Sequence, residues 1–203
     1  MPPLPDLPLR DTTFVVVDVE TTGMSAVEGR ITEIAMIKVR NGAPVDEFST
    51  LVNPLITIPA FITDLTGIDN LMVRNAPTAR EVVPFLLEFL RDDVFVAHNA
   101  PFDWSFVSQT VRREKSIDLH NPQVCTVRLT RRLLPTLPSK SLGLVAQHLD
   151  IQIPQRHRAS GDAYATSVIL IKYLSFLERN CGVANLQDLL TYQSSPRTRY
   201  QSM

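Results

Sequence analysis

Two carboxylates follow directly on a run of apolar residues near the start of the chain. The segment FVVVDVETTG, residues 14–23, has the pattern of a buried strand that ends in Asp18 and Glu20. Side chains alternate along a strand, so both acids point to the same side and Val19 points to the other. Two such charges raise each other's pKa, and a divalent cation such as Mg²⁺ or Mn²⁺ between them reverses that cost. The alternative is a strand that simply ends in two solvated acids.

Two further acids stand where helices are expected to begin. Asp103 lies in HNAPFDWSF, with Asn99 near the helix cap, and Asp162 lies in HRASGDAYAT, with Ser160 as the expected cap. The helix dipole alone favours an acid at either position. His157 precedes Asp162 by five residues in a polar loop, and a single loop histidine is more often inert than catalytic.

Hydrophobic periodicity and turn signals predict the elements that must position these side chains. Strands are expected at 13–19, 31–40, 44–52 and 94–97, with a tight turn at Asn41-Gly42 between the second and third. Helices are expected at 59–66, 78–90, 101–115, 125–134, 141–149 and 160–180. This order predicts an α/β fold in which helices pack on a mixed sheet.

Length and composition fit one folded domain. Of the 203 residues, 1–12 are expected to be a disordered Pro-rich head, 13–180 the domain, and 181–203 a short helix with a polar tail or linker. No apolar run is long enough for a membrane span, and the first residues lack a secretory signal. Cys125 and Cys181 match no metal spacing and are expected to be free thiols. The expected location is therefore cytoplasmic, without a membrane partner.

Charge is distributed unevenly along the chain. Residues 1–103 contain seven Lys and Arg against fifteen Asp and Glu, whereas residues 104–160 contain nine against three. A basic segment of this kind could line a groove for a phosphate backbone, or it could be the solvated faces of helices.

Taken together, these segments resemble the DEDDh class of 3′→5′ exonucleases, which includes the proofreading epsilon subunit of bacterial DNA polymerase III. FVVVDVETTG matches the first motif, VFVAHNAPFDWSFV the second, and HRASGDAYAT the third. LTGI at 65–68 and SLGLVAQHL at 141–149 are also similar to the segments between those motifs. The resemblance covers roughly residues 13–178. It implies a ribonuclease-H-like fold, in which a mixed five-stranded sheet has its first strand in the centre and helices on both faces.

The resemblance also implies a mechanism with two divalent cations, Mg²⁺ or Mn²⁺. Asp18 would bridge both ions, Glu20 and Asp162 would help to hold the ion that carries the attacking water, and Asp103 would act on the other ion. His157 would be the general base that takes a proton from the water. The product would be a nucleoside 5′-monophosphate released from a 3′ end.

Contacts with the substrate follow from the same resemblance. The turn after the first strand would approach the terminal nucleotide, the LTGI threonine would line its pocket, and the second motif would contact its sugar, phosphate and base. Phe102 could stack on the last base or, equally, pack in the core. The LTGI segment could line the nucleotide pocket or simply end a helix. The implied substrate-binding residues are Thr21, Thr22, Gly23, Thr66, His98, Asn99 and Phe102.

Several functions remain open at this point. The favoured one is degradation of a single-stranded DNA 3′ end in proofreading or repair. The same chemistry on RNA is an alternative, because the sequence does not show how the site treats a 2′-hydroxyl. A binding module that only recognises nucleic-acid ends is a third. The domain could also work beside a DNA polymerase or be fused to another repair-nuclease domain.

Overall fold

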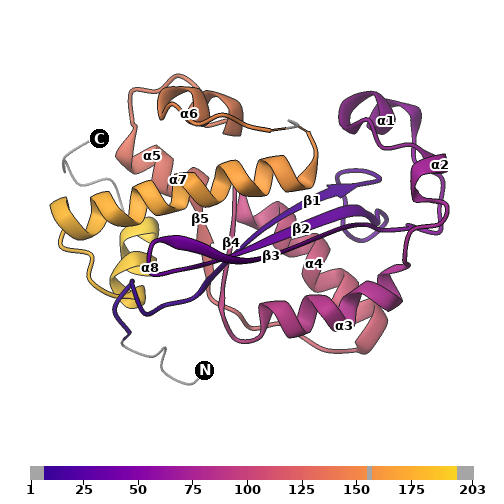
Figure 1. The fold of residues 1–203 in the computed structure, drawn as a ribbon, viewed down its shortest axis with the longest axis horizontal. Helices are drawn as coiled ribbons and strands as arrows, with labels where there is room; N and C mark the ends of the chain where they lie inside the picture. The colour runs from indigo at the N-terminus through magenta and orange to yellow at the C-terminus, as the bar shows by residue number, and fades with distance from the viewer. Residues whose placement is uncertain (1–6, 155–156, 196–203) are drawn as a thin grey trace.

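A mixed five-stranded sheet forms the centre of the molecule (Figure 1). The computed structural model describes residues 7–154 and 157–195. The strands are β1 Phe14–Thr21, β2 Ile31–Arg40, β3 Ala43–Leu51, β4 Val94–Ala97 and β5 Gln123–Cys125, in the order β3-β2-β1-β4-β5. β1 pairs antiparallel with β2 and parallel with β4. The expected mixed sheet with a central first strand is confirmed.

Helices cover both faces of this sheet (Figure 1). One face packs on α3 Ala79–Leu90 and α4 Ala100–Lys115, and the other packs on the long helix α7 Ala159–Asn180. The remaining helices are α1 Ala60–Thr66, α2 Asn70–Val73, α5 Thr126–Leu133, α6 Leu142–His148 and α8 Leu186–Ser194. Three layers result, and α1 and α2 form a small satellite with its own apolar cluster.

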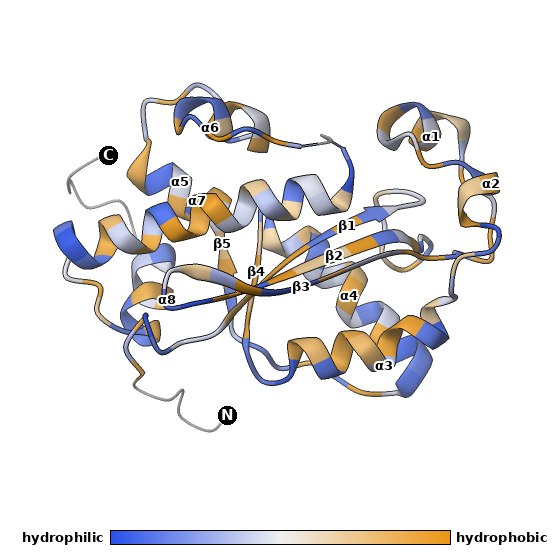
Figure 2. Cartoon of the chain, in the orientation of Figure 1, coloured by the Kyte–Doolittle hydropathy of each residue, from blue (hydrophilic) through white to orange (hydrophobic). Residues whose placement is uncertain are grey.

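The alternation of β1 explains the layers. Phe14 and Val16 point into the core under α7, whereas Val15 and Val17 point into the core over α3 and α4. All four side chains are buried, which accounts for the unbroken apolar run at the start of the strand. In Figure 2 hydrophobic residues run along β1 and β2, and the helices combine hydrophobic and hydrophilic residues. The same alternation places residue 18 on the α7 side of the sheet.

Three local features were not predicted from periodicity. The helix expected at 125–134 is found as α5, but the strand β5 that precedes it is too short to give a periodic signal. It exists because β4 pairs with one edge, while Gln193 of α8 hydrogen-bonds the Cys125 N–H (3.0 Å) and the Gln123 carbonyl (2.7 Å). α2 was not expected. α7 begins at Ala159 rather than after a Ser160 cap, for a reason given below.

Part of the N-terminal head packs on the domain. Leu9 is buried, and Pro8 forms an isolated bridge with Asn185. Disorder is therefore not found for residues 8–12, because the apolar Leu9 side chain has a place in the core. The predicted division at residues 12 and 180 stays a prediction, and the expected polar tail from residue 196 lies outside the described residues. Among the described helices, none combines the length and apolar character of a membrane span.

Candidate active site

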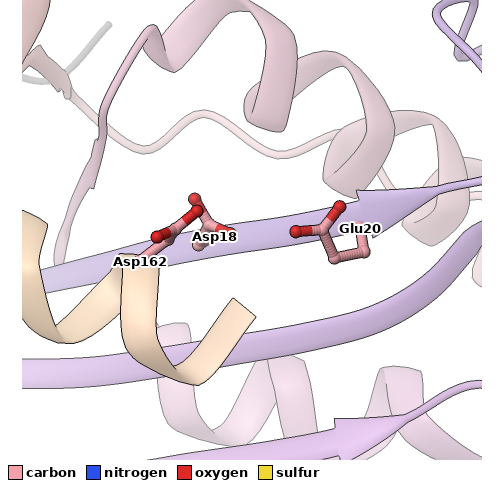
Figure 3. Close-up of side chains that lie close together, drawn as sticks. All are labelled: Asp18, Glu20 and Asp162. Carbon is pink, nitrogen blue, oxygen red and sulfur yellow. The ribbon is translucent and has the colours of Figure 1, made fainter. Parts of the chain in front are cut away.

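Three of the predicted acids converge between β1 and α7 (Figure 3). Asp18 and Glu20 come from β1, and Asp162 comes from the first turn of α7. One carboxylate oxygen of each lies within 4.8 Å of those of the other two. All three side chains are only partly buried. The packing of α7 on β1 thus gathers acids that are more than 140 residues apart in the chain.

Asp103 reaches the same strand from the opposite layer. β4 pairs with β1 only as far as Val16, so among the described residues no strand lies beside the rest of this edge of β1. The buried Asp103 carboxylate takes that place and accepts a hydrogen bond from the Val19 N–H at 3.2 Å. Its charge raises the pKa of Asp18 and Glu20, so it lies close to the group of three without belonging to it.

The acids destabilise one another's charged forms. Burial, followed by the charges of Asp103 and Asp162, raises the pKa of Asp18 well above its usual value. Burial, followed by the charges of Asp162 and Glu33, raises the pKa of Glu20 to about 8. Burial also raises the pKa of Asp103 to about 8, against the hydrogen bonds that stabilise its charged form. A cluster of this kind favours a compensating positive charge.

The sequence analysis missed Glu33 and Arg158, which form a partly buried ion pair beside the cluster. Arg158 Nε lies 3.1 Å from both Glu33 carboxylate oxygens, and its Nη2 lies 2.5 Å from Oε1. Glu33 also accepts a hydrogen bond from the Ala159 N–H at 2.8 Å. A carboxylate from β2 therefore satisfies the start of α7, which is why Ser160 is not the cap. The signal that could have revealed Glu33 is a single acid inside the apolar strand ITEIAMIKVR.

His157 stands immediately before this ion pair. Its side chain is exposed, and its φ of 63° lies in the left-handed region that few residues other than glycine adopt. The structure therefore places His157 two residues before the start of α7, the helix whose first turn carries Asp162. Its role as a base stays a prediction.

Two threonines at the end of β1 form hydrogen bonds with the backbone of the loop that follows. Thr21 and Thr22 are buried; the Thr21 hydroxyl donates to the Gly23 carbonyl at 2.7 Å, and the Thr22 hydroxyl accepts from the Arg30 N–H at 3.0 Å. A Cβ on Gly23 would meet nothing within 4 Å, so the fold itself leaves open space there. Thr66 is also buried, and its hydroxyl bonds the Ile62 carbonyl and the Ile68 N–H.

The second-motif residues occupy different environments. Nε2 of His98 is hydrogen-bonded to the Lys140 carbonyl and Nδ1 to the Thr126 hydroxyl, each at 2.8 Å, and burial lowers the pKa of His98. A neutral ring with its proton on Nε2 fits both bonds. Asn99 is exposed and caps α4 with a φ of 77°. Phe102 is partly buried against Phe106, with ring centroids 5.0 Å apart.

Comparison with known proteins decides what this arrangement belongs to. The RNase_T family model, described as exonuclease, matches residues 15–170. The chain belongs to this exonuclease family. The DNA polymerase III subunit epsilon of Aquifex aeolicus is 36% identical over 89% of the chain and 90% of its own length. The expected family is confirmed.

A much longer polymerase and a solved exonuclease structure are also similar to this chain. The PolC-type DNA polymerase III of Clostridium perfringens is 45% identical over 79% of the chain, which spans only 11% of that polymerase. The solved structure of exonuclease X in complex with 5′ overhanging duplex DNA is 29% identical, with a TM-score of 0.65 over 80% of the chain and 91% of its own. The sheet and its helices are thus the ribonuclease-H-like fold of known exonucleases.

The basic residues that the structure describes in segment 104–160 lie on several different elements. Arg112 pairs with Asp118, and Arg113 donates to carbonyls of the loop after β1. Arg158 pairs with Glu33. The arginines of α5 line a separate surface pocket next to α8: Arg128, Arg131 and Arg132. The excess of positive charge in residues 104–160 is therefore divided among several elements.

The carboxylate cluster of the exonuclease suits a divalent cation. Its donors are hard oxygen atoms, close together and partly exposed, and their mutual repulsion raises their pKa values. Mg²⁺ and Mn²⁺ prefer such ligands. The residues present therefore fit the metal-dependent chemistry that the sequence predicted.

Proposed function

We propose that this exonuclease domain removes nucleotides one at a time from the 3′ end of DNA, using Mg²⁺ or Mn²⁺. The observation that carries this proposal is the convergence of Asp18, Glu20 and Asp162 within 4.8 Å at the C-terminal end of β1. Membership of the exonuclease family and the DNA named for its relatives support the reaction and the substrate, and the resemblance to the DEDDh class supports the 3′→5′ direction. The product is a nucleoside 5′-monophosphate.

The acids hold the cations that the reaction needs. When bound, divalent ions neutralise the carboxylates, polarise the scissile phosphate and increase the acidity of water. Asp18 would be a ligand of both ions, and Glu20 and Asp162 would help to hold the ion that carries the attacking water. Asp103 acts from the other side of β1, where its hydrogen bond to Val19 fixes its carboxylate.

His157 supplies the base. Its exposed ring accepts a proton from the attacking water while the bond to the leaving 3′ oxygen breaks. Histidine is the side chain most often used as a general acid or base near neutral pH. Its place beside the first turn of α7 supports this assignment, because Asp162 lies on that turn.

The terminal nucleotide is proposed to bind in front of the turn after β1. The open space at Gly23 allows close approach of a ligand to the backbone, and the hydrogen bonds of the Thr21 and Thr22 hydroxyls fix the turn. Thr66, whose hydroxyl is bonded within its own segment, is proposed to line the pocket from α1. Asn99 is exposed enough to bind the sugar or phosphate directly. The remaining assigned contacts are stacking on Phe102 and an indirect contribution from His98, whose ring nitrogens are already bonded to the protein.

A DNA polymerase is the proposed working partner. The epsilon relative is a polymerase subunit by name, and the PolC-type relative is a polymerase of which this chain matches a small part. In this view residues 13–180 are the exonuclease unit, acting in the cytoplasm on single-stranded 3′ ends. Fusion to a repair nuclease is the second arrangement of the same unit.

A digestion panel tests the proposal. Single-stranded DNA, duplex DNA and RNA of one sequence, labelled at the 5′ end, are incubated with Mg²⁺, Mn²⁺ or EDTA. We expect a ladder that shortens from the 3′ end of single-stranded DNA with either metal and no products in EDTA. Equal activity in EDTA would reject the metal chemistry, and faster digestion of RNA would establish the exoribonuclease alternative. Tight binding of ends without products would indicate an end-binding module.

A further inference from the structure

A partly buried ion pair joins the start of α7 to β2. The side chain of Glu33 is 7% exposed and that of Arg158 is 32% exposed. The guanidinium group contacts both carboxylate oxygens, and one of those oxygens also accepts the Ala159 N–H. We call these two residues the Glu33–Arg158 clamp.

The clamp stands where a carboxylate is electrostatically unfavourable. Glu33 lies directly opposite Glu20 across the β1–β2 pair, and like charges at such positions repel. The charge of Glu33 raises the pKa of Glu20, and that of Arg158 lowers it. A neutral residue would suit the sheet better, so the acid at position 33 serves something other than strand pairing.

The clamp determines the path of the backbone that carries His157. Arg158 is the residue immediately after His157 and is the N-cap of α7, yet it makes no local side-chain cap. The backbone at His157 is left-handed, a conformation that a non-glycine residue keeps only when its surroundings impose it. No side-chain hydrogen bond or ion pair of His157 is found within the part of the chain that the structure describes. The position of the ring is therefore set by the backbone on which it stands.

We infer that the Glu33–Arg158 clamp positions His157 for its proton transfer. Glu33 and Arg158 are positioning residues: they contact neither substrate nor cation, and they act by fixing the backbone between His157 and Asp162. The inference rests on the proposed function, because it takes His157 to be the base. If the clamp only stabilised the fold, its loss would reduce stability, and its effect on kcat would be the same with and without His157.

A double-mutant cycle separates these two roles. We compare kcat of the full chain on single-stranded DNA with saturating Mn²⁺ for Arg158→Ala, His157→Ala and the double variant. Arg158→Ala should lower kcat about 10-fold in the presence of His157, the scale typical of groups that orient reacting residues. In the His157→Ala background the further loss should be under about twofold, because the positioned group is gone. An equal loss in both backgrounds would overturn the inference.

Matched variants control for charge and folding. Arg112→Ala breaks the exposed pair with Asp118, away from the site, and should leave kcat unchanged. Arg158→Lys keeps the charge but loses the planar fork that binds both carboxylate oxygens. If Arg158→Ala does not fold by circular dichroism, the Lys variant replaces it in the same cycle. A Lys variant with the kcat of the unaltered protein, or with the same loss in both His157 backgrounds, would overturn the inference.

Hydrogen–deuterium exchange tests the clamp without any nuclease assay. In EDTA, Arg158→Ala and Glu33→Gln should each speed amide exchange in residues 157–162 at least about threefold, whereas Arg112→Ala should not. Unchanged exchange in both clamp variants would overturn the inference. A chain that shows clamp-dependent exchange but digests no substrate would instead reject the proposed function. The two failures are thus distinguishable.

Discussion

The two ends of α7 pack on the same face of the sheet but differ in character. At the N-terminal end, Asp162 meets the acids of β1 and the clamp satisfies the first turn. One turn further, the buried Thr166 hydroxyl has no hydrogen-bond partner among the described residues. At the other end, Tyr173 is fully buried and its hydroxyl bonds Thr130 at 2.8 Å.

The C-terminal half of α7 contributes to the stability of the fold, whereas its N-terminal half contributes to the candidate active site. The C-terminal half buries apolar side chains such as Leu170 and Leu177, and its buried phenol is satisfied. The N-terminal half gathers carboxylates whose pKa values are raised by burial and mutual repulsion. One end of α7 therefore stabilises the fold, and the other gathers acids whose charged forms a bound cation would stabilise.

The largest expected effect comes from removing a charge at the acid end. Asp18→Asn should lower kcat about 10³-fold or more, since the loss of a shared cation ligand costs several kcal/mol in the transition state. The same change should raise the melting temperature in EDTA, because it removes a carboxylate whose charged form is destabilised. Digestion assays and thermal denaturation measure both. An active variant, or one less stable in EDTA, would contradict the division of roles along α7.

Loss of the base should have the next largest effect. His157→Ala should lower kcat by about 10²–10⁴-fold, the range for general acid–base catalysis. Its ring is exposed and makes no part of the core, so stability and Mn²⁺ affinity should remain unchanged. Calorimetric titration with Mn²⁺ checks the affinity. A variant that no longer binds the ion would show His157 to be a ligand.

The stability of the folded chain should depend on pH, because the charged forms of the clustered acids are unfavourable. Glu20 and Asp103 have pKa values of about 8 in the folded chain, far above their usual values. The folded chain therefore keeps protons that the unfolded chain has released, and the free energy of unfolding should fall as pH rises from about 5 to about 8.

Urea denaturation in EDTA across this range measures that fall, and saturating Mn²⁺ should reduce it by binding the deprotonated acids. Glu20→Gln is the matched variant, and its slope with pH should be smaller. A slope that does not change in this variant would show that other groups dominate.

The smallest effect on activity is expected at the far end of the helix. Tyr173→Phe removes the buried hydrogen bond to Thr130 and should lower the free energy of unfolding by about 1 kcal/mol. Its kcat should stay within about twofold of the unaltered protein. Urea denaturation and the digestion assay test both points, and a tenfold loss of kcat would show that the two ends are coupled.

Local patterns were enough for most of the fold. The apolar run of β1, the Asn41-Gly42 turn and the amphipathic α3 each have a short-range signal, and all were found. β5 has no such signal, since three residues show no period and its pairing depends on β4 and Gln193. The start of α7 was misplaced for a similar reason: its cap comes from Glu33, 126 residues earlier in the chain.

By itself, the sequence determined which residue types were present, the strand that places Asp18 and Glu20 on one side, and the resemblance of its motifs to an exonuclease family. Only the tertiary structure decided that Asp162 closes the cluster, that Asp103 fills the open edge of β1, and that Glu33 holds the start of α7. The physical reason is the range of the interactions. Periodicity and turn preference act between neighbours in the chain, whereas ion pairs and crowded charges depend on distances that exist only after folding.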